Sequence, residues 1–487
     1  MKKILALLLV TIFCCSFSGC GTKTADVSLE DDQSKPVELV WYTIGPSPKD
    51  LDKVMAKVNE YTKEKLNCTL KLVVIDYGDY EKKVQTLAVG GEQVDIMFTA
   101  SWALDYRSNA AKGMFHPMNE LLQKYGQGTL KALDPLLFEG TKFKGENYAI
   151  PGQGSYASQL GYFFNKKIVD KYNFDFAAVK KLTDLMPLFA KIKADNPNIT
   201  PVHGTNFYGA RDKFDYMIAG DFPGVVRMDD PKCKVINQYE DQEFLSNLKQ
   251  VREVYLAKYS YQDITKQGTD ADFGQGRVAC EMTNYHPFEE TMMTRKYGFP
   301  VSVVLMLPHP VITSNSVAGA MVAISTTSKN PARAMKLLDM VNTDPYLMNL
   351  LYYGIEGVHY TKVNDKQVHI TPEGRASWDI AGWGLGNQYI CYVPDTEPAD
   401  KWEQYAKFDH SGVRSPLFGF VFDARPVEKE IVAINSFMAQ YTMELKVGAC
   451  DIDKGAAAYT EKCKAAGMDK LFAEWQKQID EWLKTKK

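Results

Sequence analysis

Side chains suited to holding a sugar follow several segments that have the apolar pattern of β-strands. Tyr42 and Thr43 end the first such segment, Trp102 directly follows the third, and Asn284 and Tyr285 follow a later one. Aromatic rings stack on the apolar face of a sugar ring, while hydroxyl and amide groups bond to its hydroxyls. These residues at strand ends are therefore candidates for contact with a ligand, with packing in the core as the alternative for each ring.

The early part of the chain alternates strand and helix patterns. Strands are expected at 37–42, 69–75 and 94–99, and apolar residues recur at helical spacing over 51–66 and again before Gly90. This order predicts right-handed crossovers and a parallel α/β sheet. Ligands of open α/β sheets bind beyond the carboxyl ends of the strands, which is where these candidates stand.

Composition favours an ordinary folded protein of about two or three domains. The chain has 487 residues, of which 45% are hydrophobic and 24% charged, and its net charge is −3. High apolar content with small net charge excludes general disorder. The 57 basic and 60 acidic residues leave no excess positive charge for phosphates, so no nucleic-acid partner is expected.

Motifs for catalysis or cofactor binding are missing from the sequence, which has no HExxH, GxSxG or P-loop pattern. Residues 152–157 fit a loose dinucleotide loop, but 160–164 reads as a strand where that loop needs a helix. Residues 451–453 lack the spacing of a calcium loop. No catalytic residue, metal or cofactor is therefore expected. The 60 acidic residues leave a glycoside hydrolase with two carboxylates open as an alternative.

The N-terminus predicts export and a lipid anchor. A short basic head precedes an apolar run over 4–13 that is too short to span a bilayer, as in a secretory signal covering 1–19. Two small residues before Cys20 resemble the bacterial lipobox, which implies lipidation of Cys20, and 20–36 is polar like a flexible tether. No later segment has enough uncharged apolar residues to span. We therefore expect a lipid-anchored protein on the extracellular face of the bacterial cytoplasmic membrane.

Six cysteines follow Cys20 in the chain, and none of them forms a CxxC pair. Disulfides are compatible with an even number outside the cell, but the spacing does not select a connectivity. Buried free thiols are equally compatible with a core of this size.

A set of motifs spans nearly the whole chain. The general ones are the strand at 94–99 and the segments 113–118 and 148–151. The more specific ones read YGIEGVHY, FGFVFD, AAGMD and EWQKQ, at 353–360, 418–423, 465–469 and 474–478. Together these motifs resemble extracellular solute-binding proteins of family 1, and the later ones resemble its LipO-type lipoproteins. Such lipoproteins are the substrate-binding components of bacterial ABC importers.

The resemblance implies an α/β periplasmic-binding-protein fold of type II, in which two lobes enclose a ligand cleft. By this analogy, lobe one holds 37–150 and 312–360, and lobe two holds 151–311 and 361–487. The two lobes would close around a ligand by hinge motion.

Three further aromatic residues become candidates through the resemblance. Tyr156 follows the expected crossing between lobes, in the region where this family contacts its ligand. Trp378 and Trp383 lie near the glycine-rich stretch 382–386, where a late loop supplies a stacking platform, although a glycine-rich turn needs no ligand to explain it. The full set of candidate ligand-binding residues is Tyr42, Thr43, Trp102, Tyr156, Asn284, Tyr285, Trp378 and Trp383.

In function, the resemblance implies a monomeric, lipid-anchored receptor rather than an enzyme. It would capture a carbohydrate, expected to be an oligosaccharide, and deliver it to the permease subunits of an ABC transporter. A secreted surface carbohydrate-active enzyme and a sensory ligand-binding protein stay open as alternatives, since the sensory protein would use the same fold.

Overall fold

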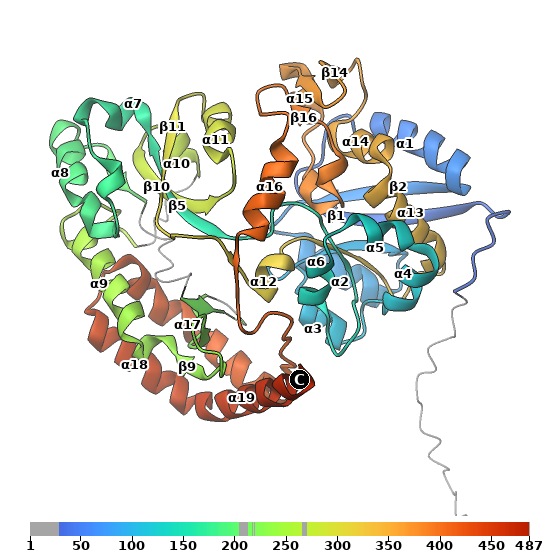
Figure 1. The fold of residues 1–487 in the computed structure, drawn as a ribbon. Helices are drawn as coiled ribbons and strands as arrows, with labels where there is room; N and C mark the ends of the chain where they lie inside the picture. The colour runs from blue at the N-terminus through green and yellow to red at the C-terminus, as the bar shows by residue number, and fades with distance from the viewer. Residues whose placement is uncertain (1–28, 204–212, 217, 219, 265–269, 487) are drawn as a thin grey trace, which may run out of the picture.

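The chain folds into two α/β lobes joined by crossing segments (Figure 1). The predicted signal 1–19 and the predicted lipidation site Cys20 lie outside the described residues. The computed structural model describes residues 29–203, 213–216, 218, 220–264 and 270–486.

The first sheet has the strand order β2-β1-β3-β13-β4. β1 pairs in parallel with β2 and with β3, whereas β13 runs antiparallel to β3 and to β4. The parallel pairing predicted from the strand–helix alternation is therefore confirmed. The strands of this sheet are β1 (Val37–Ile44), β2 (Cys68–Ile75), β3 (Ile96–Thr99), β4 (Ile150–Pro151) and β13 (Met321–Ile324).

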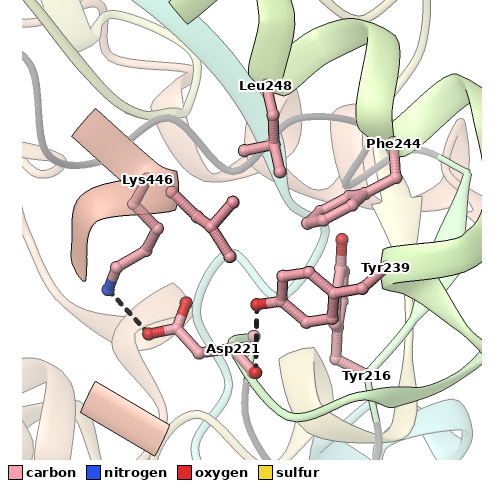
Figure 2. Close-up of a pocket in the computed structure, with 8 residues that line it drawn as sticks. Tyr216, Asp221, Tyr239, Phe244, Leu248 and Lys446 are labelled. Atoms are coloured by element: carbon pink, nitrogen blue, oxygen red, sulfur yellow. Dashed lines mark hydrogen bonds and ion pairs between the residues drawn. The ribbon is translucent and has the colours of Figure 1, made fainter. Parts of the chain in front are cut away.

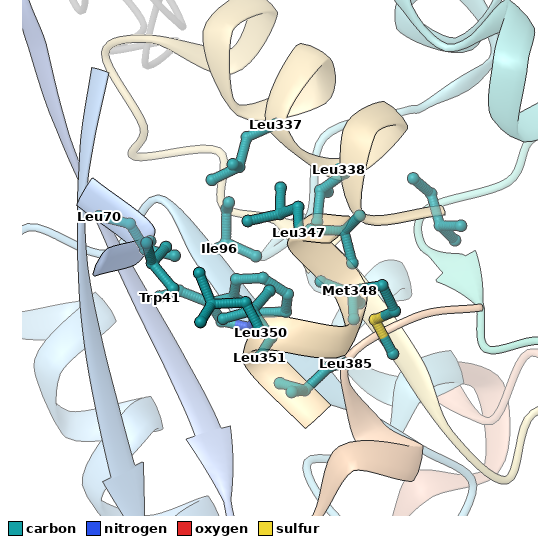
Figure 3. Packing of buried hydrophobic residues seen from close by; sticks show 14 of the residues in the cluster. Trp41, Leu70, Ile96, Leu337, Leu338, Leu347, Met348, Leu350, Leu351 and Leu385 are labelled. Atoms are coloured by element: carbon teal, nitrogen blue, oxygen red, sulfur yellow. The ribbon is translucent and has the colours of Figure 1, made fainter. Parts of the chain in front are cut away.

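Helices pack on this sheet and bury its apolar side chains. Trp41 of β1 is fully buried among Ile96, Leu337 and Leu351, which come from one strand and two helices (Figure 3). Burial of such side chains is the main favourable contribution to folding. The helices of this lobe include α1 (Leu51–Leu66), α2 (Tyr80–Gly90), α3 (Tyr106–Ala111), α4 (Asn119–Tyr125), α5 (Gln127–Ala132), α6 (Pro135–Thr141), α12 (Ser314–Val317), α13 (Pro331–Thr343) and α14 (Pro345–Tyr353).

The second sheet has the order β11-β5-β10-β6, in which β5 is antiparallel to both of its neighbours. The strand predicted at 160–164 is confirmed as part of β5, so the preceding glycines do not open a helix as a dinucleotide loop would. The strands are β5 (Gln159–Asn165), β6 (Thr200–Val202), β10 (Val278–Tyr285) and β11 (Val301–Leu305), and the helices are α7 (Lys166–Val169), α8 (Met186–Asp195), α9 (Gln242–Leu256), α10 (Asp270–Gly274) and α11 (Glu289–Tyr297).

A helical layer from the end of the chain completes lobe two. These helices lie below the second sheet in Figure 1 and share a core with a small antiparallel sheet, in which Phe222, Tyr459 and Trp475 are buried. The elements are α17 (Glu428–Val447), α18 (Ile452–Ala465), α19 (Met468–Thr485), β7 (Phe214–Asp215), β8 (Gly224–Arg227) and β9 (Val235–Asn237).

The segment 361–410 belongs to lobe one, so the expected lobe boundary at residue 360 is wrong. Trp378, Leu385 and Trp402 lie in the same buried cluster as Trp41 of the first sheet. The apolar side chains of this segment cover α14, a contact between distant parts of the sequence that no local pattern reveals. Its elements are β14 (Tyr360–Lys362), β15 (Gln367–Ile370), α15 (Pro372–Ser377), β16 (Val393–Pro394) and α16 (Lys401–His410).

Three chain segments cross between the lobes, and they bond to one another. β12 (Val311–Ile312) pairs in parallel with β17 (Val413–Arg414), and Ser158 exchanges backbone hydrogen bonds with Val311. We define lobe one as 29–151 and 313–410, and lobe two as 159–305 and 416–486. α16, the last helix of lobe one, lies on the side of that lobe toward lobe two in Figure 1.

Residues 29–36, expected to belong to a flexible tether over 20–36, are instead bound to lobe one. From Leu29 onward the chain makes side-chain contacts with lobe one, including a buried ion pair of Asp31 with Arg333. The polar composition of this stretch suggested a tether because it gave no sign of the buried arginine that binds it. The six cysteines that follow Cys20 are free thiols, so the disulfide alternative is not realised.

Candidate ligand-binding site

A pocket of about 470 Å³ opens between the two lobes. Lobe two contributes Glu281 and Thr283 from β10 and much of α11, and lobe one contributes Arg375 of α15 and Asp379. Ligand pockets are typically concave and of several hundred cubic ångströms, with a few convergent polar groups. This pocket has that size and both kinds of wall.

An exposed aromatic surface lies beside the pocket, formed by Tyr77, Trp102 and Trp383, which we call the aromatic platform. The ring centroids of Trp102 and Trp383 are 6.0 Å apart, and those of Tyr77 and Trp102 are 6.5 Å apart. Phe98 of β3 supports both tryptophans from below, at 5.9 and 5.6 Å. Trp102 is 53% exposed and Tyr77 is 50% exposed. A contiguous group of exposed rings, unlike a single exposed ring, is typical of a surface that meets a ligand or partner.

The carboxylate of Asp379 acts on both the platform and the pocket. Burial and the nearby carboxylate of Asp379 raise the pKa of Tyr77 above its usual value. Asp379 also lines the pocket. The Trp383 ring extends from the short helix Gly382–Gly384, which packs on Phe98. Asp379 therefore brings a negative charge to the pocket and to the neighbourhood of the Tyr77 ring.

Hydrogen bonds hold the exposed Trp102 in place. Its indole Nε1 donates to the carbonyl of Gly319 at 2.7 Å, and the neighbouring Ser101 hydroxyl donates to the carbonyl of Asn315 at 3.0 Å. Asn315 in turn donates its amide to the carbonyl of Tyr216 in lobe two. A ring fixed before binding loses less entropy when a ligand stacks on it.

The polar wall of the pocket mixes paired and unpaired charges. Arg295 of α11 reaches lobe one, where it bonds to the Thr396 hydroxyl at 3.0 Å and pairs with Glu397 at 3.3 Å. Among the described residues, Arg375 and Asp379 make neither a side-chain hydrogen bond nor an ion pair. Two such groups facing one pocket are available to a ligand.

Burial shifts the pKa of Glu289, which lines the pocket, and that of the nearby His286. Burial raises the pKa of Glu289 to about 7, against the opposing effect of Lys401. Burial, with a smaller effect of Lys401, lowers the pKa of His286 to about 4, so this imidazole is neutral at pH 7. Burial and then Arg295 lower the pKa of Arg375, which places the two guanidinium groups near each other across the lobes.

Two of the eight candidates from the sequence meet at the platform, namely Trp102 and Trp383. Tyr156 and Trp378 lie instead in buried clusters. The Tyr156 hydroxyl donates to Asp134 at 2.8 Å, and the Trp378 indole donates to the carbonyl of Tyr352 at 3.3 Å. Both residues therefore have complete structural roles.

The remaining four candidates are not part of the platform. Thr43 is fully buried, and Tyr42 packs against the buried cluster that includes Tyr80 of α2. Asn284 is exposed and accepts a hydrogen bond from Ser158 on a crossing segment. Tyr285 lines a separate pocket of about 560 Å³ and packs its ring 6.0 Å from that of Phe408.

Sequence reasoning missed Tyr77, Arg375, Asp379 and the residues of α11. A signal existed for Tyr77, because it follows the end of β2 as Trp102 follows the end of β3. Arg375 and Asp379 follow no strand of the main sheets, and only the fold of 361–410 onto lobe one brings them to the pocket.

A second cavity, inside lobe two, holds only about 10 Å³ (Figure 2). Its polar groups are already bonded, since Lys446 pairs with Asp221 at 2.6 Å and the Tyr239 hydroxyl donates to the Asp221 carbonyl at 3.2 Å. A space of this size holds one water molecule at most. It is not a ligand site.

The described residues contain neither a metal-binding cluster nor a membrane-spanning helix. No group of three His, Cys, Asp or Glu side chains is arranged to hold a metal ion. No helix in the described part of the chain is long and apolar enough to cross a membrane.

Comparison with known proteins identifies the chain's relatives. The model of the bacterial extracellular solute-binding protein family matches residues 45–348, and a domain of unknown function, DUF3502, matches 416–484. A carbohydrate ABC transporter substrate-binding protein of Streptococcus pneumoniae serotype 4 is 30% identical over 483 residues, which cover 98% of this chain and 97% of the relative.

Solved structures agree with this relationship. The N-glycan transport solute-binding protein (NgtS) of Streptococcus pneumoniae is 31% identical, with a TM-score of 0.86 over 93% of this chain and 100% of that one. The same protein in complex with Man5GlcNAc matches with 31% identity and a TM-score of 0.78, again over 93% and 100%. The expected two-lobed α/β fold is therefore confirmed, and the chain belongs to the bacterial extracellular solute-binding protein family.

Proposed function

We propose that this protein captures an oligosaccharide between its two lobes and delivers it to the permease subunits of an ABC importer. The observation that carries the proposal is the presence of an aromatic platform on lobe one together with a polar pocket that both lobes line. Stacking binds the apolar faces of sugar rings, and the unpaired charged groups bond to their hydroxyls. This combination suits a sugar of several units better than an apolar ligand.

The relatives narrow the ligand class. The NgtS relative was solved in complex with Man5GlcNAc. We therefore propose that the ligand of this protein is also a mannose-rich oligosaccharide. In this assignment Trp102 and Trp383 stack against sugar rings, while Arg375 and Asp379 bind hydroxyl groups.

Contacts between the lobes support capture by closure. Arg295 of lobe two pairs with Glu397 of lobe one, and Glu397 also pairs with Lys401 at 2.6 Å. Because the pocket walls belong to different lobes, hinge opening would separate the two halves of the site. The permease would then recognise the closed, loaded form, and the receptor would act as a monomer without chemical turnover.

A lipid on Cys20 would hold this receptor at the extracellular face of the membrane. The signal pattern of 1–19 and the small residues before Cys20 support the anchor. Changing Cys20 to Ala should release the protein from the membrane fraction into the medium. Retention of the Cys20→Ala protein on cells would contradict the anchor.

Calorimetry with Man5GlcNAc tests the binding site. Trp102→Ala should weaken affinity at least roughly tenfold, about 1.4 kcal/mol, while the melting temperature without ligand stays the same. Tyr346→Ala is the matched control, because Tyr346 is 56% exposed on α14 of lobe one and lies outside the pocket lining. Equal affinities of the two variants would remove Trp102 from the site.

Two further measurements separate this function from its alternatives. Mass spectrometry of Man5GlcNAc after long incubation with the protein should return the glycan unchanged, whereas a carbohydrate-active enzyme would cleave it. Deletion of the gene should abolish glycan uptake by cells. Normal uptake with a lost transcriptional response to the glycan would instead indicate a sensory protein.

A further inference from the structure

The described chain begins with a segment, 29–36, that is bound along lobe one. Leu29 packs against the main core, and its carbonyl accepts a hydrogen bond from the Tyr125 hydroxyl at 2.8 Å. Glu30 pairs with Lys124 of α4 at 2.6 Å. In Figure 1 this segment lies on the side of lobe one that faces away from lobe two.

Arg333 of α13 fixes the segment from within the lobe. Its guanidinium is almost fully buried, at 1% exposure, and its Nε donates to both carboxylate oxygens of Asp31 at 2.9 Å. Lys336, one turn further along α13, pairs with Asp31 at 2.8 Å. We call Asp31, Arg333 and Lys336 the Arg333 clamp.

The same guanidinium also ties the segment to the end of α1. Nη1 donates to the carbonyls of Leu66 and Asn67 at 2.8 and 3.0 Å, and Nη2 donates to the carbonyl of Asp32 at 2.9 Å. Carbonyls at a helix C-terminus lack partners within the helix and attract a cation. The arginine thus donates hydrogen bonds both to carbonyls at the end of α1 and to a carbonyl of the N-terminal segment.

Charge makes this clamp hard to open. Burial alone would raise the pKa of Asp31, but hydrogen bonds from Arg333 and Lys336 lower it below its usual value. The carboxylate is therefore ionised at neutral pH. Withdrawing it would leave a buried guanidinium without its counter-ion, which is strongly unfavourable.

We call the stretch between Cys20 and Leu29 the membrane leash. We infer that the Arg333 clamp sets the length of this leash and the point where it leaves lobe one, so that the face of lobe one formed by α4, α5 and α13 lies next to the lipid bilayer. This inference rests on the proposed lipid at Cys20. Nine residue steps separate Cys20 from Leu29, and seventeen separate it from Val37 at the start of β1. A fully extended chain spans roughly 30 Å over nine steps and roughly 60 Å over seventeen. The clamp therefore halves the largest distance that the chain can span between the lipid on Cys20 and lobe one.

A short leash on this side has a consequence for ligand capture. Lobe one is held near the membrane by the clamp, while lobe two lies on the side of lobe one opposite to the clamped segment (Figure 1). Hinge motion would then move lobe two relative to a lobe one that stays beside the permease. The partner of the α4–α5–α13 face is thus the lipid surface itself.

The clamp is tested first without any lipid. A Cys20→Ala, Cys450→Ser protein with a nitroxide at Gln33→Cys reports the mobility of the segment by electron paramagnetic resonance. Asp31→Ala should convert a restricted spectrum into a mobile one. Asp32→Ala is the matched control, since the neighbouring Asp32 side chain bonds within the segment, to Ser34 and Lys35. A restricted spectrum in the Asp31→Ala protein would overturn the clamp.

The leash is tested with the lipidated protein in liposomes. A fluorophore at Lys131→Cys on α5 should transfer energy strongly to an acceptor on the lipid headgroups, and one at Lys191→Cys on α8 should transfer weakly. Asp31→Ala should at least halve the transfer from Lys131→Cys, and so should insertion of eight Gly-Ser residues between Cys20 and Leu29. The insertion leaves the clamp intact, so it tests the leash even if Asp31→Ala fails to fold.

Two results would overturn the inference. Equal transfer from the two labelled positions would show that lobe one does not face the membrane, and insensitivity to the insertion would show that the leash does not limit distance. Absence of lipid on Cys20 of the wild-type protein, measured by mass spectrometry, would refute the proposed anchor and with it the inferred leash, whereas a restricted Gln33 label would leave the clamp intact.

Discussion

Two arginines in lobe one show how differently the same side chain can be used. Arg333 is buried and bonded to a carboxylate and to four carbonyls, whereas Arg375 faces the interlobe pocket without a side-chain hydrogen bond or ion pair among the described residues. A charge with every donor satisfied stabilises the fold, while a charge left available in a pocket can bind a ligand. The same guanidinium group therefore holds the fold together in the clamp and is available to a ligand in the pocket.

The tryptophans repeat this contrast. Trp378 is 5% exposed and its indole N–H is bonded inside the core, while Trp102 presents its ring to solvent from a fixed position. Both were equally good candidates by residue type. Their exposure separates them, and substitutions should separate them in the same way.

Removal of the clamp arginine should give the largest effect on stability. Arg333→Met removes the buried partner of Asp31, which keeps only Lys336, and removes the donor to four carbonyls, so the free energy of unfolding should fall by about 3–5 kcal/mol. Chemical denaturation monitored by circular dichroism measures the change. Arg375→Met is the control and should leave the unfolding midpoint unchanged. A loss below about 1 kcal/mol for Arg333→Met would show that the clamp contributes little to folding.

Truncation of the buried tryptophan should come next. Trp378→Ala opens a cavity in the core of lobe one and should cost about 3 kcal/mol or more of unfolding free energy. Trp102→Ala should cost less than about 1 kcal/mol, because its ring is already half exposed. If Trp102→Ala destabilised the protein as much as Trp378→Ala, the platform would have to be regarded as part of the core.

Loss of the pocket arginine should affect binding and leave folding intact. Arg375→Ala should weaken Man5GlcNAc affinity roughly tenfold, about 1.4 kcal/mol, by calorimetry. Lys131→Ala on α5 removes an exposed cation away from the pocket and should leave affinity unchanged. Equal affinities would mean that Arg375 does not contact the glycan.

The smallest effect should be a pH dependence from Glu289. Its pKa is about 7 in the fold and 4.5 in its ordinary state, so the native protein holds the extra proton and loses stability as pH rises through 7. His286, whose pKa is lowered to about 4, acts in the opposite direction, but only below about pH 6.5.

Stability should therefore be compared between pH 6.5 and pH 8. The wild-type protein should lose up to about 1 kcal/mol through Glu289, and Glu289→Gln should reduce that loss because glutamine stays neutral. Thermal unfolding at the two pH values measures it. An unchanged pH dependence in Glu289→Gln would show that Glu289 is ionised throughout. The charges that surround Glu289 are Lys401, Lys296, Glu290 and Glu397.

Much of the fold could be predicted from local pattern. The strands around 37–42, 69–75 and 94–99 and the helix between the first two are present, because alternation and helical spacing of apolar residues reflect local geometry. The family also followed from motifs spread along the chain. The lobe assignment of 361–410 failed, because it depends on packing between segments distant in sequence.

The site was predictable only in part. The strand-end rule found Trp102 and would have found Tyr77, but it also selected Thr43, which is fully buried. A residue at the end of a strand can point into the core or out of it, and one residue of register decides which. Arg375 had no local signal of any kind.

The sequence by itself determined the elements, the parallel order of the first strands and the family, because each of these is written in short-range spacing or in motifs. Only the tertiary structure decided which aromatic rings are exposed, which arginine is satisfied, and where the tether begins. Burial and partnering depend on which distant segments meet. The choice between a clamp and a binding site is therefore made by packing, not by residue type.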